Sequence, residues 1–128
     1  IDFEPLDPPL DANVVEDAFV ASERALLAGA AREAGEPTDH WIKAGWCAKE
    51  AVGKALGIGV VGGPRNVEIV GVNSPGRRLE VILHGSLAER LAQLDATSSL
   101  DAWLASFDSS VAAICLLPTQ GKSIRGNR

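Results

Sequence analysis

Apolar residues recur at helical spacing in two stretches of the first half of the chain. Residues 11–34 read as helical, with Ser22 as a cap and an apolar series at Leu26, Leu27, Ala30, Ala31 and Ala34. Thr38 and Asp39 open a second helix that runs to about Leu56, and Gly57 is a good residue for its C-terminal cap. The apolar seam of this second helix is Trp41, Ala44, Ala48, Val52 and Ala55.

The rest of the pattern is typical of short strands. Residues 1–4 read as the end of a strand, followed by an extended proline linker, and residues 67–72 and 79–83 flank a strong turn signal at 73–76. Ser86-x-x-Glu89 is a capping box for a short helix to about Leu94. Residues 102–105 and 111–117 predict a last pair of strands. This order predicts an α+β fold with an antiparallel sheet.

Length and composition fit one globular domain. The chain has 128 residues, of which 46% are hydrophobic and 23% charged. We predict a domain over residues 1–117 and a flexible, polar and basic tail over residues 118–128. The chain contains no Met and begins at Ile1, which indicates a processed product, an excised domain or a missing start.

Composition also excludes some classes of protein. No stretch approaches 18 apolar residues, so no membrane span is expected. Residues 1–40 carry a net charge of −8 and the remainder +3, but aromatic residues make up only 5% and Tyr is absent. Nucleic-acid binding is therefore set aside, although the basic part would suit a small anionic ligand or an acidic partner. Cys47 and Cys115 are predicted to be reduced, buried thiols of a cytoplasmic protein.

Two glycine patterns resemble phosphate-binding loops but lack the required context. Residues 57–62 match G-x-G-x-x-G, yet a helix precedes and a strand follows, which is the reverse of the dinucleotide-binding order. A nucleotide-binding oxidoreductase is therefore a disfavoured alternative. Gly121-Lys122-Ser123 resembles the end of a P-loop, but Leu116 stands where that motif needs its first glycine.

Asp2-x-Glu4 is a stronger chemical signal. Residues two apart in a strand point to the same face, so the two carboxylates project together from Cα atoms about 7 Å apart. Paired carboxylates suit a hard cation such as Mg²⁺. From this pair alone, a solvated strand end is the simpler interpretation.

The second signal lies in the helix predicted over residues 38–56. Glu50 and Lys54 are i and i+4 and share a face, and Lys43 and Cys47 lie along the same line. A surface ion pair worth roughly 0.3–0.5 kcal/mol is one interpretation. In the other, the carboxylate joins a metal or accepts a proton while the ammonium neutralises a phosphate.

These residues resemble a known family. Residues 46–57, Trp-Cys-Ala-Lys-Glu-Ala-Val-Gly-Lys-Ala-Leu-Gly, closely resemble the signature W-x-x-K-E-A-x-x-K-A-x-G of the 4′-phosphopantetheinyl transferase superfamily. Asp2-x-Glu4 resembles its other signature, G-[IV]-D-x-E, with the Gly position just before Ile1, and residues 19–27 resemble a segment ending in E-R-x-L-L. Looser similarity in the later strands extends the resemblance to Pro118.

The resemblance implies an activity and a site. Such enzymes move the 4′-phosphopantetheine arm of coenzyme A to a serine of an acyl or peptidyl carrier protein. Asp2, Glu4 and Glu50 would hold Mg²⁺ against the pyrophosphate of coenzyme A, and Glu50 could also take the serine proton. Lys54 would contact the transferring phosphate. Lys49 is the other candidate for coenzyme A binding, although a structural ion pair suits it better.

The chain departs from the short members of the family, which are homotrimers and carry a Ser-His pair near their last hairpin. Here Ser106 is followed by Phe107. This ending is more similar to the second half of the longer members, or to a domain of a polyketide synthase. As a second half, the chain would need an N-terminal half-domain. The departure leaves an alternative function, a non-catalytic carrier-docking or assembly domain of a megasynthase.

Overall fold

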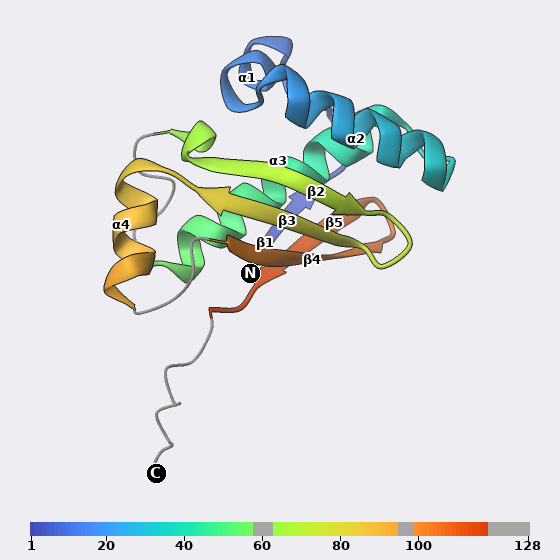
Figure 1. Ribbon diagram of the computed structural model, residues 1–128. Helices are drawn as coiled ribbons and strands as arrows, with labels where there is room; N and C mark the ends of the chain where they lie inside the picture. Colours follow the sequence, from blue (N-terminus) through green and yellow to red (C-terminus); the bar gives the residue numbers. More distant parts are fainter. Residues whose placement is uncertain (58–62, 95–98, 118–128) are drawn as a thin grey trace.

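A computed structural model describes residues 1–57, 63–94 and 99–117 of the chain. Within these residues the strands form one antiparallel sheet in the order β1-β5-β4-β3-β2 (Figure 1). The strands are β1 (Asp2–Pro5), β2 (Val67–Asn73), β3 (Arg78–Leu83), β4 (Ser99–Phe107) and β5 (Ser110–Cys115). The predicted α+β class with an antiparallel sheet is confirmed.

One face of this sheet is covered by helices. Helix α3 (Thr38–Ala55) packs across β1, β5 and β4, and α2 (Ala21–Ala34) packs against α3 and β2 (Figure 1). The sheet register places Asp2 beside Ala113 and Ala113 beside Leu104, so these three residues share the helix-covered face. All three are buried, whereas Phe3, which points the other way, is exposed. The acidic edge strand therefore lies directly against α3.

Helix α3 follows the predicted seam closely. Trp41, Ala44, Ala48 and Val52 are buried in the core, and Ala55 is partly buried. The helix ends as expected, because Gly57 has a φ of 77°, a left-handed conformation that glycine adopts without strain.

The single helix expected over residues 11–34 is wrong. The chain instead forms α1 (Ala12–Ala18) and α2, with extended backbone at Phe19 and Val20 between them. Val20 is the N-cap of α2, and its N–H donates to Glu23 Oε1 at 2.8 Å, so the expected cap at Ser22 is also wrong. The break has a packing reason, because it sends Phe19 into the core with no exposed surface.

Helix α4 (Gly85–Gln93) is present, but its start differs from the expected one. His84 occupies the N-cap position, so the capping box predicted at Ser86 and Glu89 does not form. Leu87 and Leu91 give the helix its buried side. A short 3₁₀ helix, η1 (Pro64–Asn66), leads into β2.

Cys47 and Cys115 are free and buried, as predicted. No helix in the described parts of the chain is long and apolar enough to cross a membrane. Residues 58–62 of the glycine-rich loop and the predicted tail over 118–128 lie outside the described residues, so the domain boundary at residue 117 remains a prediction.

Candidate functional site

The candidate site forms where β1 runs along the second half of α3. Strand β1 carries Asp2 and Glu4 on the side that faces the helix, and α3 presents Glu50 and Lys54 one turn apart. The charges lie close enough that Asp2 raises the pKa of Glu4 on the strand and of Glu50 on the helix. The four residues that the sequence singled out are therefore brought together.

Asp2 is the central group of this cluster. It is 5% exposed, and its Oδ1 accepts a hydrogen bond of 2.6 Å from the ammonium of Lys54. Its other oxygen, Oδ2, is buried and has no hydrogen-bond donor within the described residues. A buried polar oxygen without a partner is costly, so Oδ2 of Asp2 offers an open position for a cation or a hydrogen-bond donor.

Burial, and after it the crowding of negative charge, raises the pKa of both other carboxyls. For Glu4, burial raises the pKa, the neighbouring carboxyl of Asp2 raises it further, and the ammonium of Lys43 opposes the shift. For Glu50, burial raises the pKa first and the charge of Asp2 adds to it, while Lys54 lowers it. A cation placed among the three carboxylates would relieve this repulsion.

Lys54 is the accessible positive charge of the site. Its side chain is 55% exposed, while its partner Asp2 is buried. The hydrogen bond to Asp2 raises the pKa of Lys54, and the nearby Glu50 adds to the effect. Lys54 therefore stays protonated and lies open to an anionic ligand at the edge of the cluster.

Cys47 lies beneath the cluster but is not arranged as a nucleophile. Its thiol is buried and donates to the main-chain oxygen of Asp2 at 3.2 Å. Burial raises the pKa of Cys47 strongly, and the charges of Asp2 and Glu4 raise it further. The thiol therefore remains protonated and holds the backbone of β1.

Lys49 does not reach this surface. Its ammonium is fully buried, pairs with Glu23 at 2.7 Å and donates to the main-chain oxygens of Ala18, Pro64 and Val67. Burial lowers the pKa of Lys49, and the Glu23 carboxylate opposes that shift. Of the two interpretations of Lys49, the structural ion pair is the one the fold supports, and contact with coenzyme A is not.

The carboxylates were also predicted to hold a metal ion. As the side chains lie, no three Asp, Glu, His or Cys residues in the described residues form a metal-holding group. The donor set itself fits a hard divalent cation, because it offers three carboxylates and one buried oxygen of Asp2 that lacks a donor.

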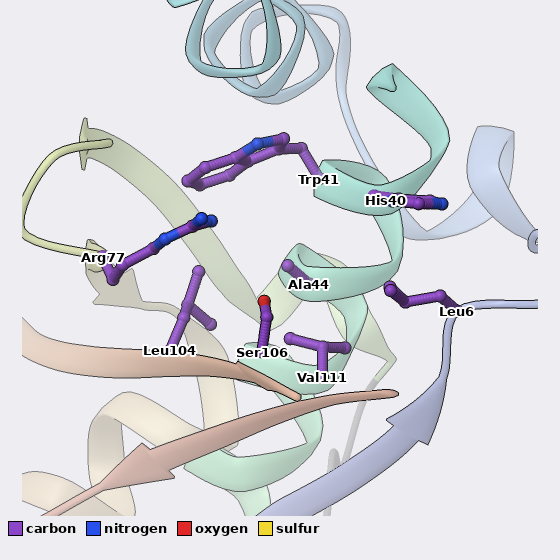
Figure 2. Close-up of a pocket in the computed structure, with 8 residues that line it drawn as sticks. All are labelled: Leu6, His40, Trp41, Ala44, Arg77, Leu104, Ser106 and Val111. Atoms are coloured by element: carbon purple, nitrogen blue, oxygen red, sulfur yellow. The ribbon is translucent and has the colours of Figure 1, made fainter. Parts of the chain in front are cut away.

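A small cavity lies apart from this cluster, over the first half of α3 (Figure 2). Its volume is about 30 Å³, room for a water or two. Arg77 reaches over it, held by two hydrogen bonds to Glu36 at 2.9 and 3.1 Å. The lining includes Trp41 and Ser106 but none of the four clustered residues, so the cavity is not the candidate site.

Together, the fold and the cluster define an α+β domain with carboxylates and an exposed ammonium on one sheet edge, a layout suited to handling a phosphate ester. A model of the 4′-phosphopantetheinyl transferase superfamily matches residues 1–115, and the chain belongs to this superfamily. Membership supports phosphopantetheine transfer in general and implies coenzyme A and a carrier protein as partners. A search of curated proteins gave no match.

Proposed function

We propose that this domain transfers the 4′-phosphopantetheine arm of coenzyme A to a serine of an acyl carrier protein, with Mg²⁺. One observation carries the proposal: Asp2, Glu4 and Glu50 converge from β1 and α3 beside the exposed ammonium of Lys54. Asp2, Glu4 and Glu50 would hold the metal ion. When bound, the ion would neutralise charge on the pyrophosphate of coenzyme A.

The residues of this chain divide the remaining work. Lys54 is exposed and protonated, so it can bind the phosphate that is transferred. Glu50 accepts the proton of the carrier serine, directly or through a water. The serine oxygen then bonds to the phosphorus of the arm as the pyrophosphate bond breaks, and adenosine 3′,5′-bisphosphate leaves.

The other face of the sheet supports a proposal about assembly. Three aromatic side chains point away from the helices: Phe3, Trp103 and Phe107, which are 57%, 46% and 48% exposed. The rings of Phe3 and Phe107 meet edge to face, with their centroids 5.9 Å apart. Ile114 and Leu116 are exposed as well. Grouped aromatic exposure of this kind marks an interaction surface. We propose that it packs against a second copy of this fold.

Phe107 also favours the alternative function, a carrier-docking domain without catalysis. It stands where short family members carry His, and its ring lies on the apolar face instead of beside the carboxylates. Calorimetry separates the two functions, because a docking domain would bind the carrier protein but not coenzyme A.

Transfer itself is tested with an apo carrier protein, coenzyme A and Mg²⁺, followed by intact mass spectrometry of the carrier. We expect the carrier to gain one phosphopantetheine arm. A chain that leaves the carrier unmodified, while a known transferase modifies the same sample, does not have the proposed activity.

A further inference from the structure

Lys43 is a buried cation that the proposed chemistry does not use. It lies on α3, seven residues or about two turns before Glu50, and is 5% exposed. Its ammonium donates to the main-chain oxygens of Pro5 at 2.9 Å and Pro8 at 2.8 Å. No carboxylate forms a salt bridge with it among the residues that the structure describes.

The sequence of the linker explains why a lysine is buried here. Pro5, Pro8 and Pro9 have no N–H, so the segment that leaves β1 cannot be fixed by main-chain donors at those positions. Its carbonyl oxygens still need partners where they are buried. Lys43 supplies the donors for two of these oxygens from α3. The N–H of Leu6 holds the same segment by donating to the main-chain oxygen of Ser109 at 2.7 Å.

The contacts of α3 with β1 form a series along one side of the helix. Lys43 holds the end of the strand at Pro5, Cys47 holds the main chain of Asp2, and Lys54 holds its side chain. Glu4 lies between these fixed points, and Glu50 lies on the same side of α3. The placement of Glu4 relative to Glu50 therefore depends on the hydrogen bond from Lys43 to the end of the strand at Pro5.

We propose that Lys43 is a positioning residue for the carboxylate cluster, which holds the end of β1 so that Glu4 stays in place against Glu50. This inference rests on the proposed function, because it assigns Lys43 to the metal-binding arrangement. Lys43 acts through the backbone and does not itself touch the substrate or the ion. A positioning role differs from a purely electrostatic one, since a buried positive charge alone would repel a cation from the site.

The test uses Lys43→Met, which removes the ammonium, and the milder Lys43→Gln, which keeps a short donor. The matched control is Arg65→Met. Arg65 also donates hydrogen bonds to two main-chain oxygens, those of Glu16 and Asp17, but it lies far from β1. All variants lose one positive charge. Two properties are measured. The first is the amide hydrogen exchange of Phe3, Glu4 and Leu6, and the second is the affinity for Mn²⁺ with coenzyme A present, by electron paramagnetic resonance.

We expect Lys43→Met to speed exchange at these amides about tenfold and to weaken Mn²⁺ binding about tenfold, with Lys43→Gln changing both less. Arg65→Met should change neither. Unchanged exchange, or unchanged or tighter Mn²⁺ binding in a folded Lys43 variant, would overturn the positioning role. If Lys43→Met fails to fold, Lys43→Gln decides by the same criteria. A wild-type chain without Mn²⁺ affinity would remove the proposed function, and this inference with it.

Discussion

Lys49 and Glu50 are neighbours in the sequence, but α3 directs them to different surroundings. Glu50 lies in the carboxylate cluster, while Lys49 is turned into the core and pairs with Glu23. The two signature motifs and their spacing indicated Asp2, Glu4, Glu50 and Lys54. They did not reveal the partner of Lys49, since Glu23 lies on another helix and no local spacing connects them. The partners of Lys43 cannot be predicted from spacing either, because they are main-chain oxygens of Pro5 and Pro8, far from Lys43 in the sequence.

Because Lys49 and Glu23 form a buried ion pair, we predict that replacing Lys49 lowers the stability of the domain instead of its affinity for coenzyme A. Lys49→Met leaves the carboxylate of Glu23 buried without its cation, so we expect a loss of about 3–5 kcal/mol in the free energy of unfolding. The double variant Glu23→Leu/Lys49→Met should lose less than the two single losses added together. Urea unfolding measures these values. Weaker coenzyme A binding by Lys49→Met at wild-type stability would show that Lys49 contacts the ligand after all.

Removing the chemical groups of the cluster should affect activity instead of folding. We expect Glu50→Gln and Lys54→Ala each to lower kcat/KM roughly 10²–10³-fold, because one removes the base and the other a cation on the phosphate. Glu89→Gln, an exposed carboxylate on α4, and Arg65→Met are the matched controls. Thermal unfolding checks that all four variants fold. Wild-type rates in both cluster variants would refute the assigned roles.

At the scale of elements, the sheet and α3 follow from periodicity, but the helix starts do not. The pattern over residues 11–34 contains no glycine or proline at residues 19 and 20, where the helix breaks. The break arises because Phe19 packs into the core and the carboxylate of Glu23 accepts a hydrogen bond from the N–H of Val20. Likewise, Ser86 and Glu89 have the spacing of a capping box, but α4 begins earlier, at Gly85. Both outcomes depend on packing between distant segments, which a local pattern does not contain.

A glycine in the middle of α3 makes a sharp test of this packing. A Cβ added at Gly45 would lie 3.0 Å from Leu27 Cδ1 and 3.1 Å from Phe19 Cε1. Gly45→Ala should therefore destabilise the domain by about 1–3 kcal/mol, although alanine favours helix. Gly29→Ala in α2 is the control, because its Cβ would meet only Arg32 at 3.9 Å, and we expect a gain of up to about 1 kcal/mol. Increased stability of Gly45→Ala in chemical denaturation would contradict the close contact of α2 and α3.

For the whole molecule, the two faces of the sheet have different roles. The helix-covered face carries the core and the carboxylates, while the other face exposes Phe3, Trp103 and Phe107. Alternation along the strands predicts which residues share a face, but not whether a second copy covers the exposed face. The local pattern of this chain does not contain the surface of a partner.

If a second copy covers this face, a charge placed in its centre should prevent association. We expect Trp103→Glu to shift the chain toward monomer in sedimentation velocity at concentrations where the wild type associates. Ala25→Glu adds the same charge at an exposed position on α2 and should leave the distribution unchanged. An associating Trp103→Glu variant, or a wild type that stays monomeric at all concentrations, would exclude self-association through this face.

We propose that the carboxylates of β1 and α3, together with Lys54, carry out phosphopantetheine transfer. The most direct measurement is the intact mass of an apo acyl carrier protein after incubation with the chain, coenzyme A and Mg²⁺. We expect the carrier to gain one phosphopantetheine arm with the wild type, and Glu50→Gln to add the arm roughly 10²–10³-fold more slowly. An unmodified carrier, in a sample that a known transferase does modify, would contradict this role of the cluster, and so would an equal rate of modification by Glu50→Gln.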